Sequence, residues 1–226
     1  MARFATSVVS FPERGVGGNP RYRGNWGPSF VEQMLATYYP GSGLVVDPMQ
    51  GSGTTGDVCK RLGFPYAGSD LRTGFDAATD DLLGRLRLRR DDPVSLIAWH
   101  PPYAGMIEYS KDPRDLSAHG TDIAKFADMV GACMRNFAGA LADDGLVCVL
   151  TANWRKAGTY YRLSTVVEVA AEAAGLILVD EVIKQQHSCS SDGKVYASLA
   201  MPRIMHETLL VFRKPTGLAA AKGAAA

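Results

Sequence analysis

The fold is decided by residues 45–55, which read Val45-Val46-Asp47-Pro48-Met49-Gln50-Gly51-Ser52-Gly53-Thr54-Thr55. An apolar segment over 44–46 leads into an acidic turn, then into glycines, and then into a helical pattern over 54–62 that Gly63 ends. This order of strand, glycine turn and helix is typical of ligand-binding α/β folds. A P-loop needs Gly-Lys-Ser/Thr, and no lysine follows these glycines, so a nucleoside triphosphate site is not expected.

The acidic and glycine residues of this turn indicate the charge of its ligand. Gly51 and Gly53 let the backbone approach a ligand closely, although the formal Gly-x-Gly-x-x-Gly match is weak alone. Asp47 would repel a pyrophosphate and suits a cation, such as a sulfonium that carries an amino group. Asp70 follows the strand-like segment 66–68, where a carboxylate can hold a ribose diol, unless it only caps a turn.

The rest of the chain alternates between strand and helix patterns. Further strands are predicted over 94–99, 146–150, 176–183 and 207–212, and helices over 123–141 and 163–174. This alternation predicts βαβ units and a mainly parallel sheet. No long helical pattern separates the last two strands, so they are expected to pair antiparallel at one edge. We expect a single domain over residues 1–216 and a flexible Ala/Gly-rich tail over 217–226.

Composition sets outer bounds on localisation and partners. The chain has 226 residues and a net charge of +1, which gives no global attraction to nucleic acid or membrane. The absence of a long apolar run and of a signal-peptide pattern predicts a cytoplasmic protein without a membrane partner. Residues 1–30, 151–166 and 184–214 each carry a local charge of +3. They would form a basic patch if they converge, and each alone is an ordinary solvated face.

The four cysteines and the histidines give little sign of a metal. The cysteines contain no Cys-x-x-Cys pair, which predicts reduced thiols that lie mostly in the core. A pair at His187 and Cys189 has no matching second pair, so no metal is expected.

A second polar turn, His100-Pro101-Pro102-Tyr103, follows the strand predicted over 94–99. The prolines fix φ and have no N–H, so carbonyl groups stay free to accept hydrogen bonds. Such acceptors, with an aromatic ring beside them, suit a flat ring that bears an exocyclic amino group. By itself the turn is better explained as a structural end to a strand, and only the glycine turn makes the functional interpretation the favoured one.

Two stretches together resemble the S-adenosylmethionine-dependent amino-methyltransferases of nucleic acids, of phage and prokaryotic type. They are the Asp-Pro-x-x-Gly-Ser-Gly-Thr-Thr of residues 47–55 and the Pro-Pro-Tyr of residues 101–103. This family comprises the adenine-N6 and cytosine-N4 DNA methylases, including restriction-modification and orphan enzymes. Weaker likeness in residues 23–30, 153–158, 184–187 and 206–214 extends the resemblance over about residues 8–214. It implies a Rossmann-like class I methyltransferase fold.

The resemblance implies a role for each matching residue. The cofactor S-adenosyl-L-methionine is expected on Asn25, Trp26, Asp47, Pro48, Gly51, Ser52, Gly53, Thr54, Asp70, Leu71 and Asp76. Among these, Asp70 would hold the ribose, and Asp76 would face the adenine edge. The catalytic residues are expected to be His100, Pro101, Pro102 and Tyr103, with the Tyr103 ring stacked on the target base.

The expected reaction is methyl transfer to the exocyclic amino group of a DNA base flipped out of the duplex, with adenine favoured over cytosine. His100 departs from the family, which has Asp, Asn or Ser there. If His100 accepts an amino hydrogen, transfer should weaken as the pH falls through its pKa, ordinarily about 6.5. Because the chain is short, recognition of the target DNA sequence is expected to come from loops 106–121 and 187–205 or from a second subunit. A homodimer is therefore one alternative. RNA or protein glutamine as acceptor and an inactive nucleic-acid-binding module are the alternatives.

Overall fold

The computed structural model describes residues 2–86, 88, 93–187 and 201–217. Within these ranges the chain forms a seven-stranded sheet in the order β1-β8-β9-β5-β4-β2-β3. The strands are β1 (Val8–Ser10), β2 (Leu44–Asp47), β3 (Tyr66–Gly68), β4 (Val94–Trp99), β5 (Leu141–Thr151), β8 (Ile177–Gln185) and β9 (His206–Arg213). All neighbouring pairs are parallel except those that β9 makes. The predicted mainly parallel sheet is therefore confirmed.

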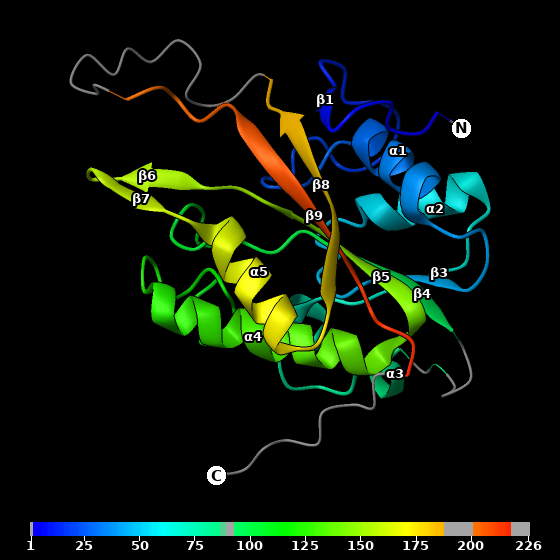
Figure 1. Cartoon of the computed structure of the whole chain (residues 1–226). Coiled ribbons are helices and arrows are strands. Elements are labelled where there is room, and N and C mark those ends of the chain that lie inside the picture. Colours follow the sequence, from blue (N-terminus) through cyan, green and yellow to red (C-terminus); the bar gives the residue numbers. More distant parts are fainter. Residues whose placement is uncertain (1, 87, 89–92, 188–200, 218–226) are drawn as a thin grey trace.

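Helices cover both faces of this sheet (Figure 1). One face carries α1 (Pro28–Tyr38) and α2 (Thr54–Leu62), and the other carries α4 (Ile123–Ala140), α5 (Leu163–Ala173) and the short α3 (Leu82–Arg85). Two hydrophobic cores result, because alternate strand residues point to opposite faces: Val45 packs with α1 and α2, and Val46 packs with α4. Three cysteines, at 59, 133 and 148, are buried free thiols as predicted, and Cys189 lies outside the described residues.

The crossovers place a topological switch point between β2 and β4. The strand that follows β2 in the chain, β3, pairs on one side of β2, whereas the strand that follows β4, β5, pairs on the opposite side of β4. Ligands of open α/β sheets bind at such a point, outside the carboxyl ends of the strands. Because β2 and β4 are parallel neighbours, their carboxyl ends bring Asp47 and His100 to one edge of the sheet.

The predicted antiparallel pairing of the last two strands is confirmed, and it brings two further residues to the same edge. β9 runs antiparallel to both β5 and β8, with Glu207 opposite Lys184. The start of β9 therefore lies beside the carboxyl ends of its two neighbours. The unpredicted strand β1 pairs with β8 on its outer side, so β8 is not the outermost strand.

A small hairpin follows the carboxyl end of β5. It consists of β6 (Trp154–Lys156) and β7 (Thr159–Tyr161), and it projects away from the sheet in Figure 1. Its two turn residues, Ala157 and Gly158, both have positive φ (48° and 81°), as in the tight turns that suit the twist of a hairpin. No helix in the described ranges is long and apolar enough to span a bilayer. The predicted tail lies outside the described residues from 218 onward.

Candidate active site

A cleft of about 1140 Å³ opens at the carboxyl ends of the strands. Of the residues that the sequence assigns to the site, all but Pro48 and Gly53 line it: Asn25, Trp26, Asp47, Gly51, Ser52, Thr54, Asp70, Leu71, Asp76, His100, Pro101, Pro102 and Tyr103. The cleft thus joins the glycine turn to the Pro-Pro-Tyr turn. Pro48 is buried, and Gly53 is the residue at which the turn leads into α2.

The glycine turn presents unpaired polar atoms. Gly53 is the N-cap residue of α2 and has a φ of +86°, a conformation that glycine adopts without steric cost. On either side of it, the Oγ of Ser52 and the Oγ1 of Thr54 are buried without a hydrogen-bond partner among the described residues. Buried hydroxyl groups are normally bonded. Two unpaired ones in a lined cleft therefore mark a place where a polar ligand fits.

Asp47 lies at the bottom of this turn, at the end of β2. Its Oδ2 accepts a hydrogen bond from the Oγ1 of Thr55 at 2.6 Å, and its Oδ1 accepts one from the backbone N–H of Met49 at 3.1 Å. Burial raises the pKa of the Asp47 carboxyl to about 7, although these two hydrogen bonds act in the opposite direction. Near neutral pH both the protonated and the charged form of this carboxyl are therefore populated. A bound cation would stabilise the charged form.

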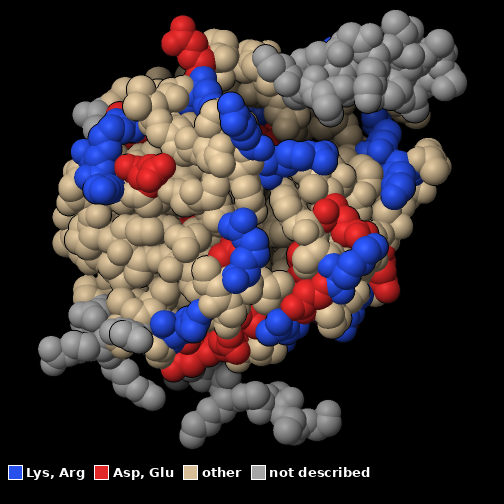
Figure 2. Space-filling model, turned by 180° about the vertical axis from the view of Figure 1, so that it is seen from behind, with Lys and Arg blue, Asp and Glu red and all other residues tan. Residues whose placement is uncertain are grey.

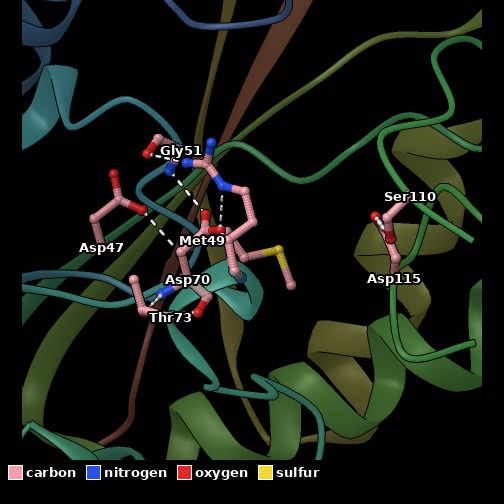
Figure 3. Close-up of polar contacts among 8 residues, drawn as sticks. Asp47, Met49, Gly51, Asp70, Thr73, Ser110 and Asp115 are labelled. Atoms are coloured by element: carbon pink, nitrogen blue, oxygen red, sulfur yellow. Dashed lines mark hydrogen bonds and ion pairs between the residues drawn. The ribbon is translucent and has the colours of Figure 1, made fainter. Parts of the chain in front are cut away.

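Asp70 follows β3, as expected, and its carboxylate is already engaged. Its Oδ2 accepts from the backbone N–H of Gly51 at 2.9 Å, which ties the acid to the glycine turn (Figure 3). Its Oδ1 accepts from the Nε of Arg72 at 2.9 Å, and the same guanidinium lies 5.0 Å from the centre of the Tyr22 ring. A ribose diol that bonds to Asp70 must therefore replace or rearrange the Arg72 contact.

The remaining predicted cofactor residues are held in different ways. The side-chain amide of Asn25 donates to the carbonyl of Asn19 at 2.7 Å, so it braces its own loop. Trp26 is buried, and its ring stacks on that of His100 at 5.4 Å between centroids. Asp76 is buried, and it accepts from the backbone N–H of Ala78 at 2.9 Å while it lines the cleft.

The second half of the cleft contains a chain of hydrogen bonds. The hydroxyl of Tyr103 donates to Oε1 of Glu207 at 2.8 Å, and its oxygen lies 2.9 Å from Nε2 of His100. The Nζ of Lys184 donates to Oε2 of Glu207 at 2.6 Å. Burial lowers the pKa of His100 to about 4, even though the charge of Glu207 acts to raise it. His100 is therefore neutral above about pH 5, and a loss of transfer caused by its protonation is expected near pH 4 rather than near the ordinary histidine pKa.

Several charged residues of the cleft had no site role in the sequence analysis, among them Lys184, Glu207 and Arg14. Lys184 and Glu207 lie in segments that carried only a weak family likeness, and Arg14 lies in the basic first segment. A glutamate directly before the mainly apolar run 208–212 is the signal that could have pointed to Glu207. Arg14 donates to the carbonyl of Trp26 at 3.2 Å, and its Nε is buried without a partner among the described residues.

The loop after Tyr103 forms another wall of the cleft. Asp115 is buried and accepts from the hydroxyls of Ser110 and Ser117, apart from the Asp47 and Asp70 group in Figure 3. The ring of Tyr109 stacks on that of Tyr22 at 6.4 Å, which joins this loop to the N-terminal segment. This loop, 106–121, is one of the two loops expected to recognise the target DNA sequence. In the other loop, 187–205, residues 188–200 lie outside the described residues.

Comparison with known proteins gives the fold. The sequence matches no protein-family model and no curated protein sequence. TrmN from Thermus thermophilus aligns over 85% of this chain and 50% of its own, with 20% identity and a TM-score of 0.52. A TehB-like S-adenosylmethionine-dependent methyltransferase from Corynebacterium glutamicum aligns over 81% and 86%, at 16% identity and a TM-score of 0.47.

A further match is a candidate DNA modification methylase from Thermus thermophilus, solved with S-adenosyl-L-methionine. It aligns over 77% of this chain and 57% of its own, with 15% identity and a TM-score of 0.44. The chain spans little more than half the length of this protein. The strand order, the switch point and the helices on both faces are those of the Rossmann-like class I methyltransferase fold.

Proposed function

We propose that this chain transfers a methyl group from S-adenosyl-L-methionine to an exocyclic amino nitrogen of a nucleic-acid base, with adenine in DNA as the favoured acceptor. The observation that carries the proposal is that the glycine turn and the Pro-Pro-Tyr turn line one and the same cleft. One turn suits the cofactor, and the other suits a planar amino group. A methyl group can pass between two ligands only where both reach one space.

The chemistry of the cleft fits the cofactor. Asp47 can pair with the ammonium of the methionine part, and Arg14 with its carboxylate, while the unpaired hydroxyls of Ser52 and Thr54 add hydrogen-bond donors. Asp70 can accept from the ribose hydroxyls once Arg72 rearranges. When bound, this cofactor supplies an electrophilic methyl group on a sulfonium.

The Pro-Pro-Tyr turn would activate the acceptor nitrogen. The amino lone pair would attack the methyl carbon as the carbon–sulfur bond breaks, which leaves the cofactor as a neutral thioether, and the nitrogen would then release one proton to solvent water. Hydrogen bonds from the two amino hydrogens to the carbonyl of Pro101 and to His100 would hold them so that the lone pair faces the methyl group. Orientation of this kind supplies much of the catalysis in an in-line displacement.

Turnover with labelled S-adenosyl-L-methionine tests the acceptor. Duplex DNA, single-stranded DNA, RNA and a glutamine-containing peptide are offered in parallel, and the products are digested to locate the methyl group. We expect N6-methyladenine from DNA. Methyl transfer to RNA or peptide alone would overturn the choice of DNA, and binding of DNA without any transfer would support an inactive nucleic-acid-binding module.

Basic and aromatic side chains at the rim support a nucleic-acid acceptor. The residues 151–166 include three basic side chains and no acid. Arg155 lines the cleft, lies 4.9 Å from the centre of the Tyr160 ring and donates to the carbonyl of Pro202 at 2.8 Å. Figure 2 shows lysine and arginine side chains around a hollow in one face of the molecule. Such a rim can contact phosphates and stack bases.

Removal of rim charges should weaken DNA binding and its dependence on salt. Arg155→Ala and Lys156→Ala are each expected to reduce the magnitude of the slope of log affinity against log salt by about 1. Each variant makes one phosphate contact fewer, so fewer counterions leave the DNA on binding. Fluorescence anisotropy of labelled duplex DNA at several salt concentrations measures the slope. The matched control is Lys60→Ala, an exposed lysine on α2 outside the cleft. An equal effect of all three variants would exclude the hairpin as the DNA contact.

Cofactor affinity should depend on the protonation of Asp47. Its carboxyl has a pKa of about 7, so the carboxylate that pairs with an ammonium predominates only above that pH. Affinity is therefore expected to fall by up to roughly tenfold per pH unit from pH 7 to pH 5. The ligand's own α-amino group, ordinarily with a pKa of about 7.7–8.0, stays protonated over this range.

Calorimetric titration of wild type, Asp47→Asn and Asp70→Asn over pH 5–7 isolates this effect. Asp47→Asn should bind weakly with a flat profile, and Asp70→Asn should bind weakly with the wild-type slope. A slope that persists in Asp47→Asn would assign the pH dependence to another group.

A further inference from the structure

A buried chain of four side chains runs through the acceptor half of the cleft. It begins at Lys184 on β8, passes through Glu207 on β9 and Tyr103, and ends at His100, with consecutive contacts of 2.6, 2.8 and 2.9 Å. Lys184 and Glu207 come from strands that lie beyond β5, whereas Tyr103 and His100 belong to the turn that follows β4. The side chains of Lys184 and Glu207 are only 15% and 9% exposed, so water does not replace their partners.

The protons along this chain can be assigned from its chemistry. Lys184 has only donors, and it pairs with the carboxylate of Glu207. Burial alone would raise the pKa of Glu207, but Lys184, His100 and Tyr103 together hold it below its ordinary value, so Glu207 can only accept. Burial and the charge of Glu207 raise the pKa of Tyr103 well above 10, so Tyr103 keeps its single proton.

That single proton decides the state of His100. Because the Tyr103 hydroxyl donates to Oε1 of Glu207, its oxygen can only accept from His100. The Nε2 of His100 must then carry a hydrogen. Burial keeps the imidazole neutral near pH 7, so the second ring nitrogen, Nδ1, carries a lone pair. This Nδ1 has no hydrogen-bond partner among the described residues, and His100 lines the cleft.

We infer that Lys184 and Glu207 are positioning residues that act through Tyr103 to hold His100 as the Nε2–H tautomer, with Nδ1 as the acceptor for a hydrogen of the substrate's amino group. The groups that surround the ring are Trp26, which stacks on it, Tyr103, and the oppositely charged Lys184 and Glu207. Assignment of Nδ1 to the substrate rests on the proposed function, whereas the tautomer does not.

Nuclear magnetic resonance tests the tautomer without substrate or cofactor. Long-range nitrogen–proton correlation of the ring nitrogens distinguishes the two neutral tautomers, and His100→Asn assigns the His100 signals among the four histidines. Wild type at pH 7 should show His100 with hydrogen on Nε2 alone. A hydrogen on Nδ1 in wild type would overturn the inference.

The matched change replaces both charged residues together, so that no charge is left buried alone. In Lys184→Met/Glu207→Leu the Tyr103 hydroxyl is free to donate to Nε2, and a population with hydrogen on Nδ1 should appear. Replacement of the exposed pair Glu32 and Arg61, with a 2.7 Å contact, is the control and should leave the His100 signals unchanged. Wild-type His100 signals in the folded double variant would contradict the relay.

Methyl transfer then tests what the tautomer does. The double variant should lower the single-turnover rate about two- to tenfold, as expected for loss of one hydrogen bond. In a His100→Asn background the same change should have a much smaller effect, because the Asn carbonyl accepts without any tautomer. Equal losses in both backgrounds would show that Lys184 and Glu207 support the structure only. A failure of transfer in wild type would overturn the proposed function and leave the spectroscopic result standing.

Discussion

Gly53→Val is expected to reduce the affinity for S-adenosyl-L-methionine at least about 100-fold, the loss of several hydrogen bonds worth about 0.5–1.5 kcal/mol each. Gly53 has a φ of +86°, where a β-branched residue is strained. A valine there must shift the turn and with it the Ser52 and Thr54 hydroxyls, which have no partner among the described residues. Isothermal titration calorimetry on the folded variant measures the affinity.

The same helix provides a matched control. Gly63 ends α2 as Gly53 begins it, with a φ of +71°, and a Cβ at either position would meet no atom within 4 Å. Gly63→Val should therefore lose a similar free energy of unfolding, about 1–2 kcal/mol, and keep wild-type cofactor affinity. If Gly53→Val bound the cofactor as tightly as Gly63→Val, the glycine turn would not be the cofactor site.

Tyr103→Ala should lower methyl transfer roughly 5- to 150-fold, which corresponds to the 1–3 kcal/mol that stacking of one base contributes. The Tyr103 ring packs partly against the core and lines the cleft beside His100. No hydrogen bond or ring contact joins it to the glycine turn among the described residues, so cofactor affinity should change by less than about twofold. Single-turnover rates and calorimetry on one preparation measure both quantities.

Tyr103→Phe separates the ring from its hydroxyl. It retains the stacking surface and loses the bonds to Glu207 and His100, so its transfer rate should lie between those of wild type and Tyr103→Ala. A Tyr103→Ala variant as active as wild type would remove Tyr103 from the acceptor site.

Much of the fold followed from local patterns, because the signals lie within single segments. The helix over 54–62 ended at Gly63 as predicted, and the strand over 94–99 has the predicted bounds. The strand predicted over 146–150 proved longer, since it begins at Leu141 and includes exposed acids that interrupt the apolar run. β1 was not predicted, because three mostly exposed residues give no periodic signal.

The sequence by itself determined the two turns and their chemistry, since the residues of each are consecutive. Each turn directly follows one predicted strand: Asp47 and the glycines follow the first, and His100 and the prolines follow the strand over 94–99. The end of that strand is enough to position each turn. Only the tertiary structure decided how charge is arranged around them. Lys184 and Glu207 are 23 positions apart, and Glu207 is 104 from Tyr103, so their bonds exist because an antiparallel β9 lies between β5 and β8. Burial in the folded chain, rather than residue type, shifts the pKa of His100 to about 4 and that of Asp47 to about 7.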